Sequence, residues 1–371
     1  MTTRREIIAG GLLAAAAAFI PAAIANAAPD PLYGPEADAS YPIDGVAPKG
    51  TTDWHNHWSP PRASALTRTG GARSGDAGDG LIRPRAYSDI DARIEHLDRV
   101  GVERQIISLG SGADPRLSVD DARSWCSVAN DDLAEVVRKY PTRFSGYTAI
   151  PTQDIKFAVA EIERGYRDLG FIGAVLPVGA VQTLEGAKQV APVLEVLQQH
   201  TGILYFHSGA AHASIKGQRT IAAPRSDVAT MRARYEKAAS YARGITTLTQ
   251  TDFLKPYPDV TVILAMLGGL APYHFATASG RLKGVSGGEP ISSLRRVYLD
   301  ASTSRTPHTL ELVASLFGAD RMLFGTDYGV WPSIAPIVSA VRRSQLTEAQ
   351  QNLLFVKNGQ DLLAAKSRRT S

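Results

Sequence analysis

The chain has 371 residues, of which 44% are hydrophobic and 20% are charged, so it can bury a large core. The formal net charge of +4 is spread along the sequence without a run of five or more Lys or Arg, and we expect no nucleic-acid partner. The single cysteine, Cys126, excludes an intrachain disulfide framework and a cysteine-clustered zinc or iron–sulfur site. Any metal ion must therefore be held by nitrogen and oxygen ligands.

Residues 1–27 predict a cleavable export signal. Arg4 and Arg5 precede an Ala- and Gly-rich stretch that ends in Ala-Asn-Ala at residues 25–27. The paired arginines resemble a twin-arginine signal, the bacterial route for folded proteins. An N-terminal membrane anchor is the alternative, but Pro21 interrupts the weakly apolar run. We expect a periplasmic or secreted protein that has no membrane association after the signal is removed.

The next segment, residues 28–50, is rich in Pro, Ala, Gly and Asp and predicts an extended tail. From residue 51 to residue 366, short apolar or β-branched runs alternate with segments of helical period. The candidate strands are, in chain order, TTDWHNHW, RQIISLG, FSGYTAIP, FIGAVLPV, GILYFHSG, VTVILAMLGG, RVYLDAS and RMLFGTDY. Eight strands separated by helices favour a (β/α)8 TIM barrel, with an open doubly wound sheet as the alternative.

Two connections, residues 59–84 and 208–224, are longer than a barrel needs, and each follows a strand end that carries histidine. Loops of this length are uncommon without a function or disorder. Because they follow the carboxyl ends of strands, both would overhang the active face of a barrel. We expect them to act as lids or substrate contacts.

Four polar side chains mark the ends of three predicted strands. His55 and His57 are two positions apart on the first strand, so their side chains would share one face. His207 closes the fifth strand and Asp327 the eighth. Carboxyl ends of barrel strands meet at one face, and three nitrogens with one oxygen suit a single Zn²⁺ ion. Water or substrate would complete the coordination.

Several motifs together resemble the amidohydrolase-related family, over about Thr51 to Leu363. They are DWHNHW, YFHSG, LGG followed by Pro272, VYLDAS and DRMLFGTDY. The similarity is to the branch of non-oxidative decarboxylases of aromatic and unsaturated acids, typified by aminocarboxymuconate semialdehyde decarboxylase and the methylsalicylate decarboxylase-like enzymes. The resemblance implies a barrel fold and a metal bound by His55, His57, His207 and Asp327. Zn²⁺ is expected, with Mn²⁺ as the alternative.

The sixth predicted strand departs from the family pattern. The resemblance implies a histidine ahead of a Gly-Gly pair, working beside the metal, but this sequence has Met266 there. A thioether cannot transfer a proton. A shifted alignment, a different chemistry, a lost activity, or a replacement by His212 or His274 would each explain it. If the strand end faces the metal, we expect the thioether to line the pocket as an apolar wall.

The fourth predicted strand closes without the lysine that a two-metal amidohydrolase would typically carry there, so one metal ion is expected. Asp53 is expected to brace the first strand rather than to bind this ion.

The favoured function is non-oxidative decarboxylation of a small organic acid, with Asp327 as the catalytic residue that delivers a proton. The alternatives are a metal-dependent hydrolase of a lactone, ester or amide, in which Asp327 accepts a proton, and an inactive metal- or ligand-binding homologue. The oligomeric state stays open, with a homodimer as one alternative. Four arginines are candidates to pair with an anionic substrate, namely Arg83, Arg85, Arg219 and Arg281.

Overall fold

The computed structural model describes residues 45–69, 87–219, 228–278, 291–302, 306–329 and 334–367. In these ranges eight parallel strands form one sheet in chain order, each paired with its sequence neighbours. The strands are β1 (Thr51–Asp53), β2 (Val102–Ile107), β3 (Phe144–Ala149), β4 (Gly173–Pro177), β5 (Ile203–His207), β6 (Thr261–Leu264), β7 (Val297–Asp300) and β8 (Met322–Leu323).

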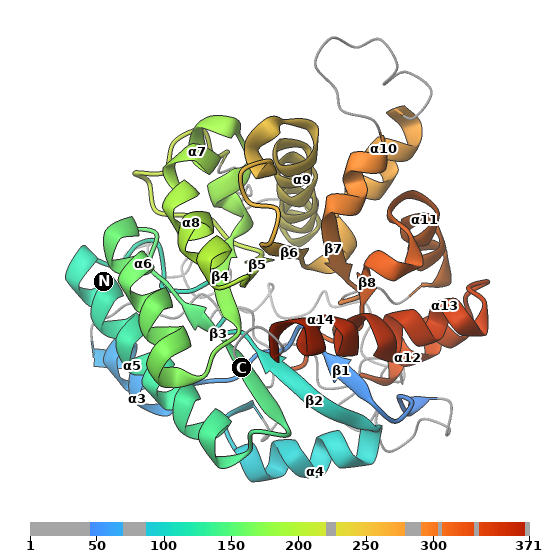
Figure 1. The fold of residues 1–371 in the computed structure, drawn as a ribbon, viewed down its shortest axis with the longest axis horizontal. Helices are drawn as coiled ribbons and strands as arrows, with labels where there is room; N and C mark the ends of the chain where they lie inside the picture. Colours follow the sequence, from blue (N-terminus) through green and yellow to red (C-terminus); the bar gives the residue numbers. More distant parts are fainter. Residues whose placement is uncertain are drawn as a thin grey trace, which may run out of the picture.

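The sheet curls into a barrel that is closed between its first and last strands. Just beyond β1, the Trp54 amide donates a hydrogen bond to the Phe324 carbonyl at 2.9 Å. Asn56 and Tyr328 then form a parallel bridge between the same two segments. Figure 1 shows the strands as an inner ring enclosed by helices. The predicted (β/α)8 TIM barrel is therefore confirmed, and the open doubly wound sheet is excluded.

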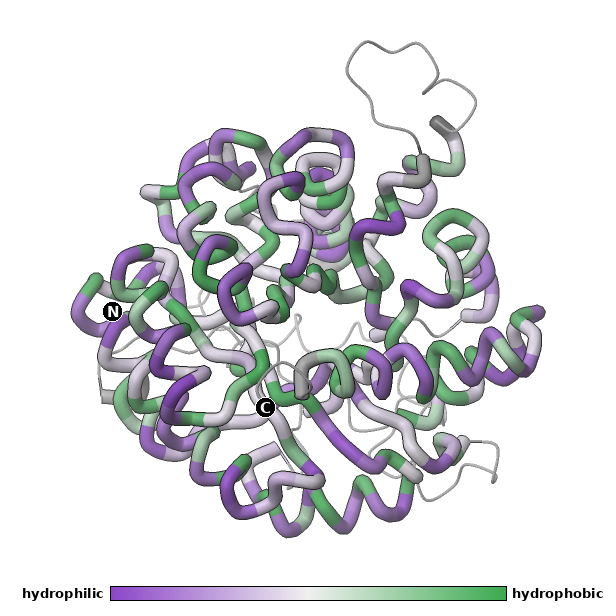
Figure 2. The backbone as a smooth tube through the Cα atoms, in the orientation of Figure 1, coloured by the Kyte–Doolittle hydropathy of each residue, from purple (hydrophilic) through white to green (hydrophobic). Residues whose placement is uncertain are grey.

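Helices follow the strands and cover the outside of the barrel (Figure 1). Strands β3 and β4 are buried at every position, because one face packs inside the barrel and the other against helices. In Figure 2 hydrophobic and hydrophilic stretches alternate along the outer helices, as expected of helices with one face on a core. The helices are α3 (Pro61–Thr69), α4 (Ile90–Val100), α5 (Val119–Lys139), α6 (Ile155–Arg164), α7 (Leu184–Gln189), α8 (Ala191–Gln199), α9 (Ala229–Gln250), α10 (Ala271–Ala278), α11 (Pro307–Phe317), α12 (Ala335–Arg342), α13 (Glu348–Asn352) and α14 (Asn358–Ser367).

Local sequence explains where several helices begin and end. Asp89, Ser118 and Asp154 cap α4, α5 and α6, each accepting a hydrogen bond from a backbone amide of the first turn. Gly101 ends α4 with φ of +77°, a left-handed conformation that glycine adopts without strain. Two short 3-10 turns follow strands near the site, η4 (Val178–Val181) after β4 and η6 (Met266–Gly268) after β6.

Several sequence predictions lie outside the described residues. These include the signal in residues 1–27, most of the tail in residues 28–50, and Arg83, Arg85 and Arg281. The connection in residues 59–84 was expected to be a loop, but its first part forms α3, so this expectation was wrong there. Among the described helices, none has the length and hydropathy that crossing a membrane requires.

Candidate metal centre

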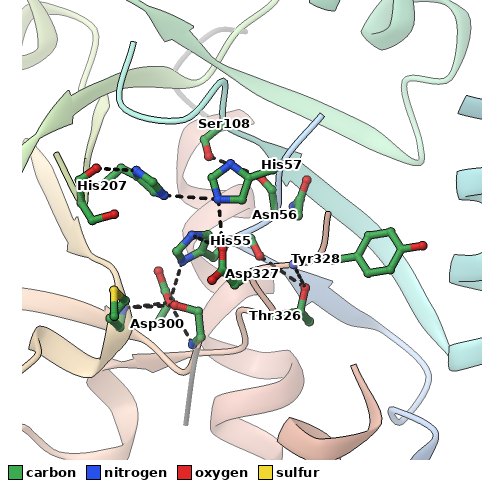
Figure 3. A network of polar contacts seen from close by, with 12 residues as sticks. His55, Asn56, His57, Ser108, His207, Asp300, Thr326, Asp327 and Tyr328 are labelled. Carbon is green, nitrogen blue, oxygen red and sulfur yellow. Dashed lines mark hydrogen bonds and ion pairs between the residues drawn. The ribbon is translucent and has the colours of Figure 1, made fainter. Parts of the chain in front are cut away.

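The four predicted ligands meet at the carboxyl end of the barrel (Figure 3). His57 Nε2 lies 3.3 Å from His207 Nε2 and 3.0 Å from Asp327 Oδ1. His55 Nε2 lies 3.4 Å from the same Asp327 oxygen. One nitrogen from each histidine lies within 4.8 Å of the other two. The barrel thus brings together residues that are up to 272 positions apart in the sequence, as we predicted from their places at the ends of strands.

These distances fit a bound divalent cation. Ligands placed 2.0–2.1 Å from a tetrahedral zinc ion are about 3.4 Å from one another, and three of the separations found here are 3.0–3.4 Å. His55 Nε2 is buried and has no aligned hydrogen-bond partner among the described residues. Where several buried imidazole nitrogens face one another, some of them have no proton to share in a hydrogen bond. Burying these lone pairs costs free energy unless a cation binds to them. The residues present therefore fit a single metal ion.

The charges of the centre also favour a cation. Burial, together with the neighbouring His57 and His55, holds the pKa of His207 well below its usual value, so this imidazole is neutral and can offer a lone pair. Burial opposes ionisation of Asp327, but the nearby imidazoles of His55 and His57 hold its pKa well below the usual value. Asp327 is therefore a carboxylate. Burial alone would lower the pKa of His55, yet the carboxylates of Asp300 and Asp327 raise it to about 10.

Asp300, at the end of β7, orients the first histidine and was not assigned a role from the sequence. Its Oδ1 lies 3.3 Å from His55 Nδ1 and accepts a hydrogen bond from the Ser302 amide at 3.0 Å. Its Oδ2 accepts a 2.8 Å hydrogen bond from the Tyr205 hydroxyl. With a pKa of about 10, His55 without a metal carries a proton on each ring nitrogen; a metal ion would displace the proton on Nε2, while the Nδ1–H stays donated to Asp300. The only sequence signal was a carboxylate closing a predicted strand in VYLDAS.

Asp53 holds β1 to its neighbours, as the sequence predicted. Its Oδ1 accepts hydrogen bonds from the His55 and Thr326 amides, both at 3.1 Å. Its Oδ2 accepts from Gln105 Nε2 at 2.7 Å and from the Thr326 hydroxyl at 2.8 Å. Burial raises the pKa of Asp53 to about 6 against these hydrogen bonds. The carboxylate thereby fixes the backbone on both sides of the centre, at His55 and next to Asp327.

Asp327 itself sits in a backbone conformation that few residues adopt. Its φ of +58° lies in the left-handed region, which aspartate tolerates better than most side chains. Its amide donates a short 2.7 Å hydrogen bond to the His55 carbonyl, which ties the turn after β8 to the end of β1. Local strain of this kind persists where the surrounding contacts hold it.

The sixth strand brings a backbone amide, not a proton-transfer group, to the centre. The Met266 amide lies 3.3 Å from Asp300 Oδ1 and 3.1 Å from Ser302 Oγ.

Neither candidate replacement histidine approaches the centre. The His212 ring pairs with Ser214 Oγ at 2.8 Å, and His274 is exposed on α10 beside Phe275.

A cavity of about 550 Å³ opens beside the centre, with His57 and His207 in its wall. Among the residues that the structure describes, three aromatic side chains line it, namely Trp58, Tyr87 and Trp125. Trp58 is held in place because it is buried and its indole N–H donates to the Ser88 carbonyl at 3.3 Å. Such walls suit a flat, unsaturated ligand. Met266 is not among the described residues that line this cavity, so the expectation that its thioether forms a wall was wrong for this cavity.

The described charged residues of the cavity comprise three cations and two carboxylates, one of which, Glu236, lies 3.8 Å from Arg243 Nη2. Arg116 is neutralised by Asp114, with Nε–Oδ1 at 2.9 Å and Nη2–Oδ2 at 2.5 Å. Arg219 lines the cavity, at a position where the sequence predicted an anion contact, and Lys237 of α9 lies in the same wall. Within the described part of the chain no carboxylate forms an ion pair with Lys237. The Lys237 charge helps to lower the pKa of His207, after the larger effects of burial and the other histidines.

Comparisons with known proteins agree with this geometry. Residues 52–364 match the model of a family described as amidohydrolase. The gamma-resorcylate decarboxylase of Polaromonas sp. (strain JS666 / ATCC BAA-500) is 27% identical over 309 residues, which cover 76% of this chain and 89% of that enzyme. The 6-methylsalicylic acid decarboxylase of Penicillium expansum is 23% identical over 296 residues, covering 74% of this chain and 84% of that enzyme.

A solved structure shows the same fold. It is the dihydroxybenzoic acid decarboxylase from Polaromonas sp. JS666 with bound manganese and the inhibitor 2-nitroresorcinol. The two structures match with a TM-score of 0.65 at 24% sequence identity, over 85% of this chain and 97% of that one.

Proposed function

The chain belongs to the amidohydrolase family, and we propose that it is a metal-dependent carboxy-lyase that decarboxylates a small aromatic or unsaturated organic acid without oxidation. The observation that carries the proposal is the His55, His57, His207 and Asp327 centre, two of whose histidines line a cavity with aromatic sides and one more described cation than carboxylate. The names of the related decarboxylases support the same reaction class.

The metal is proposed to be a single Zn²⁺ or Mn²⁺ ion held by the four ligands. Imidazole suits zinc, and manganese is the metal bound by the Polaromonas neighbour. When bound, such an ion supplies positive charge that holds the oxygens of the acid and stabilises charge that develops on them.

Asp327 is proposed to move the proton that replaces CO₂. Because the pKa of Asp327 is depressed, it begins as a carboxylate and accepts the proton of a hydroxyl group beside the carboxyl group of the substrate. It then donates this proton to the carbon that bears the carboxylate. The carbon–carbon bond breaks, CO₂ leaves, and its electron pair returns to the ring and the oxygen. The product oxygen finally takes a proton from water.

The experiment that tests this function measures CO₂ release from a panel of hydroxybenzoic acids by the purified protein, before and after metal removal with a chelator. Turnover that stops on chelation and returns with Zn²⁺ or Mn²⁺ is expected. Panels of lactones, esters and amides run in parallel test the hydrolytic alternative. Hydrolysis of these compounds without CO₂ release from any acid would overturn the proposal.

Lys237 and Arg219 are proposed to attract the acidic substrate. Lys237→Met should raise KM roughly tenfold and change kcat little, because a charge-assisted contact formed in both ground and transition state contributes to binding alone. Steady-state kinetics measures this split. Lys156→Met is the matched control, since Lys156 is exposed on α6 and lies outside the cavity wall. Equal effects of the two substitutions would contradict a local role for Lys237.

We also propose export to the periplasm or to the outside of the cell, because the paired arginines precede a weakly apolar stretch that ends in Ala-Asn-Ala at residues 25–27. Replacing both Arg4 and Arg5 by lysine should leave the precursor inside the cell, because a twin-arginine route requires the pair. Fractionation followed by mass measurement of the N-terminus detects this. Unchanged export of the double variant rules out the twin-arginine route, and an intact N-terminus on exported wild-type protein rules out cleavage.

A further inference from the structure

The three histidines of the proposed centre are held in different ways. His55 Nδ1 lies 3.3 Å from Asp300 Oδ1. His207 Nδ1 lies 2.9 Å from the Ser208 carbonyl oxygen. By contrast, the polar contacts that the His57 ring makes with described residues all involve Nε2. A metal-binding imidazole is usually oriented through its second nitrogen, so the orientation of His57 depends on its backbone.

The backbone of His57 is bound on both sides. Its amide donates a 2.7 Å hydrogen bond to the Tyr328 carbonyl, and its carbonyl accepts a hydrogen bond from Nη2 of Arg93 on α4. The Arg93 Cζ atom also lies 5.5 Å from the centroid of the Tyr328 ring. Tyr328 directly follows Asp327 in the sequence. Arg93 therefore contacts the two segments that carry His57 and Asp327.

Arg93 is fully buried, so its charge and its N–H groups must be satisfied inside the protein. Its Nη1 donates to Gln105 Oε1 at 3.0 Å and to Asn56 Oδ1 at 3.4 Å. Gln105 in turn donates to Asp53, which accepts a hydrogen bond from the His55 amide. Burial lowers the pKa of Arg93 to about 10, so the guanidinium stays charged at neutral pH. Its planar fork thus links β2 to the segment that follows β1.

We propose that Arg93 is a positioning residue of the metal centre, whose guanidinium fixes the His57 peptide so that His57 Nε2 meets the other ligands. The inference rests on the proposed metal centre and not on the proposed reaction. Several bonds separate the His57 carbonyl from Nε2, so a small rotation of the peptide displaces this nitrogen by a larger distance. Metal ligands have to stay within about 0.5 Å of the binding geometry, and the buried guanidinium supplies this restraint.

The test compares Arg93→Met with Arg296→Met. Arg296 is the matched control, because its guanidinium also donates to two backbone carbonyls, those of Tyr257 and Val260. It precedes β7 at the amino end of the barrel, opposite the metal centre. Both variants should melt at a lower temperature than wild type, since each loses hydrogen bonds to the backbone. Only Arg93→Met should weaken Zn²⁺ affinity, roughly tenfold or more, as is typical when an outer partner of a ligand is removed. Competition with a chromogenic chelator, at a temperature where all variants are folded, measures this affinity.

Arg93→Lys keeps the buried charge, and it tests the guanidinium fork even if Arg93→Met does not fold. The lysine side chain ends one bond short of the Nη atoms, so it cannot keep the contacts of both. Zn²⁺ affinity should fall as in Arg93→Met. Crystal structures of the metal-free proteins should show His57 Nε2 displaced by about 0.5 Å or more from its positions 3.3 Å from His207 Nε2 and 3.0 Å from Asp327 Oδ1. In Arg296→Met these two distances should match those of wild type.

The two measurements separate this inference from the proposed metal centre. If wild type binds Zn²⁺, the inference requires both a weaker affinity and a displaced His57 ring in Arg93→Lys, and either change alone would overturn it. An equal loss of affinity in Arg296→Met would also overturn it, because the effect would then be general destabilisation. If wild type binds no Zn²⁺, the metal centre fails. The metal-free structures then decide alone, since a displaced His57 ring in Arg93→Lys supports the positioning role and an unmoved ring refutes it.

Discussion

Asp327→Asn is expected to abolish turnover and to weaken metal retention together. In the proposed reaction the Asp327 carboxylate is both a ligand and the group that accepts and returns the proton. Its Oδ1 lies 3.0 Å from His57 Nε2 and 3.4 Å from His55 Nε2, so a neutral amide removes negative charge from the middle of the centre. Loss of an acid–base group typically costs ~10²–10⁴-fold in rate, and the lost ligand adds to this.

Met266→Leu is the matched comparison for that variant. It changes a side chain next to the centre but keeps the Met266 amide that approaches Asp300 and Ser302. Its kcat should stay close to that of wild type. CO₂ release and metal content of both variants would be measured on the same preparations. A Met266→Leu enzyme impaired as severely as Asp327→Asn would contradict this division of labour and would indicate a substrate contact by sulfur.

Asp300→Asn is expected to weaken metal affinity by about 10–100-fold, which is typical when the partner of a ligating histidine is removed. The Asp300 carboxylate contacts four donors, which are His55 Nδ1, the Tyr205 hydroxyl and the Met266 and Ser302 amides. The side chain of Asn has only one acceptor oxygen, so it cannot accept from all four. His55 then loses its fixed tautomer, and Nε2 no longer faces the centre in every molecule. Titration of the metal-free protein with Zn²⁺ measures the change.

A buried aspartate far from the centre controls for simple loss of a core charge. Asp132 on α5 is buried and accepts hydrogen bonds from the Arg62 and Ala63 amides and from the Arg62 guanidinium. Asp132→Asn should lower stability and leave metal affinity unchanged. If it weakens metal binding as much as Asp300→Asn does, the effect is global destabilisation, and the orienting role of Asp300 is wrong.

The sequence predicted those parts of the fold and site that depend on local pattern. Eight apolar runs separated by helical segments were enough to predict the barrel, because the residue pattern of each segment indicates whether that segment forms a strand or a helix. The four proposed ligands were found for the same reason, since each polar residue closes an apolar run. Barrel topology then brings such strand ends together without further information.

The remaining parts of the site depend on side chains whose place is set by packing. Lys237 lies on the long helix α9, and nothing in the polar and apolar pattern of this helix distinguishes a lysine that lines the cavity from a lysine on the outer surface. Asp300 closes a strand in the same way as Asp327, but only the contact with His55 reveals its role. Met266 has an unusual φ of +59° and is not among the described residues that line the cavity, and the sequence pattern indicates neither feature.

Metal content is the most direct test of the central claim that His55, His57, His207 and Asp327 hold one ion. Purified mature protein is loaded with Zn²⁺ or Mn²⁺, passed over a desalting column and measured by elemental mass spectrometry, beside a His57→Ala and His207→Ala double variant of equal folded content. We expect one ion per wild-type chain and almost none in the double variant. Wild-type protein that retains no ion, or a double variant that retains as much as wild type, would contradict this claim.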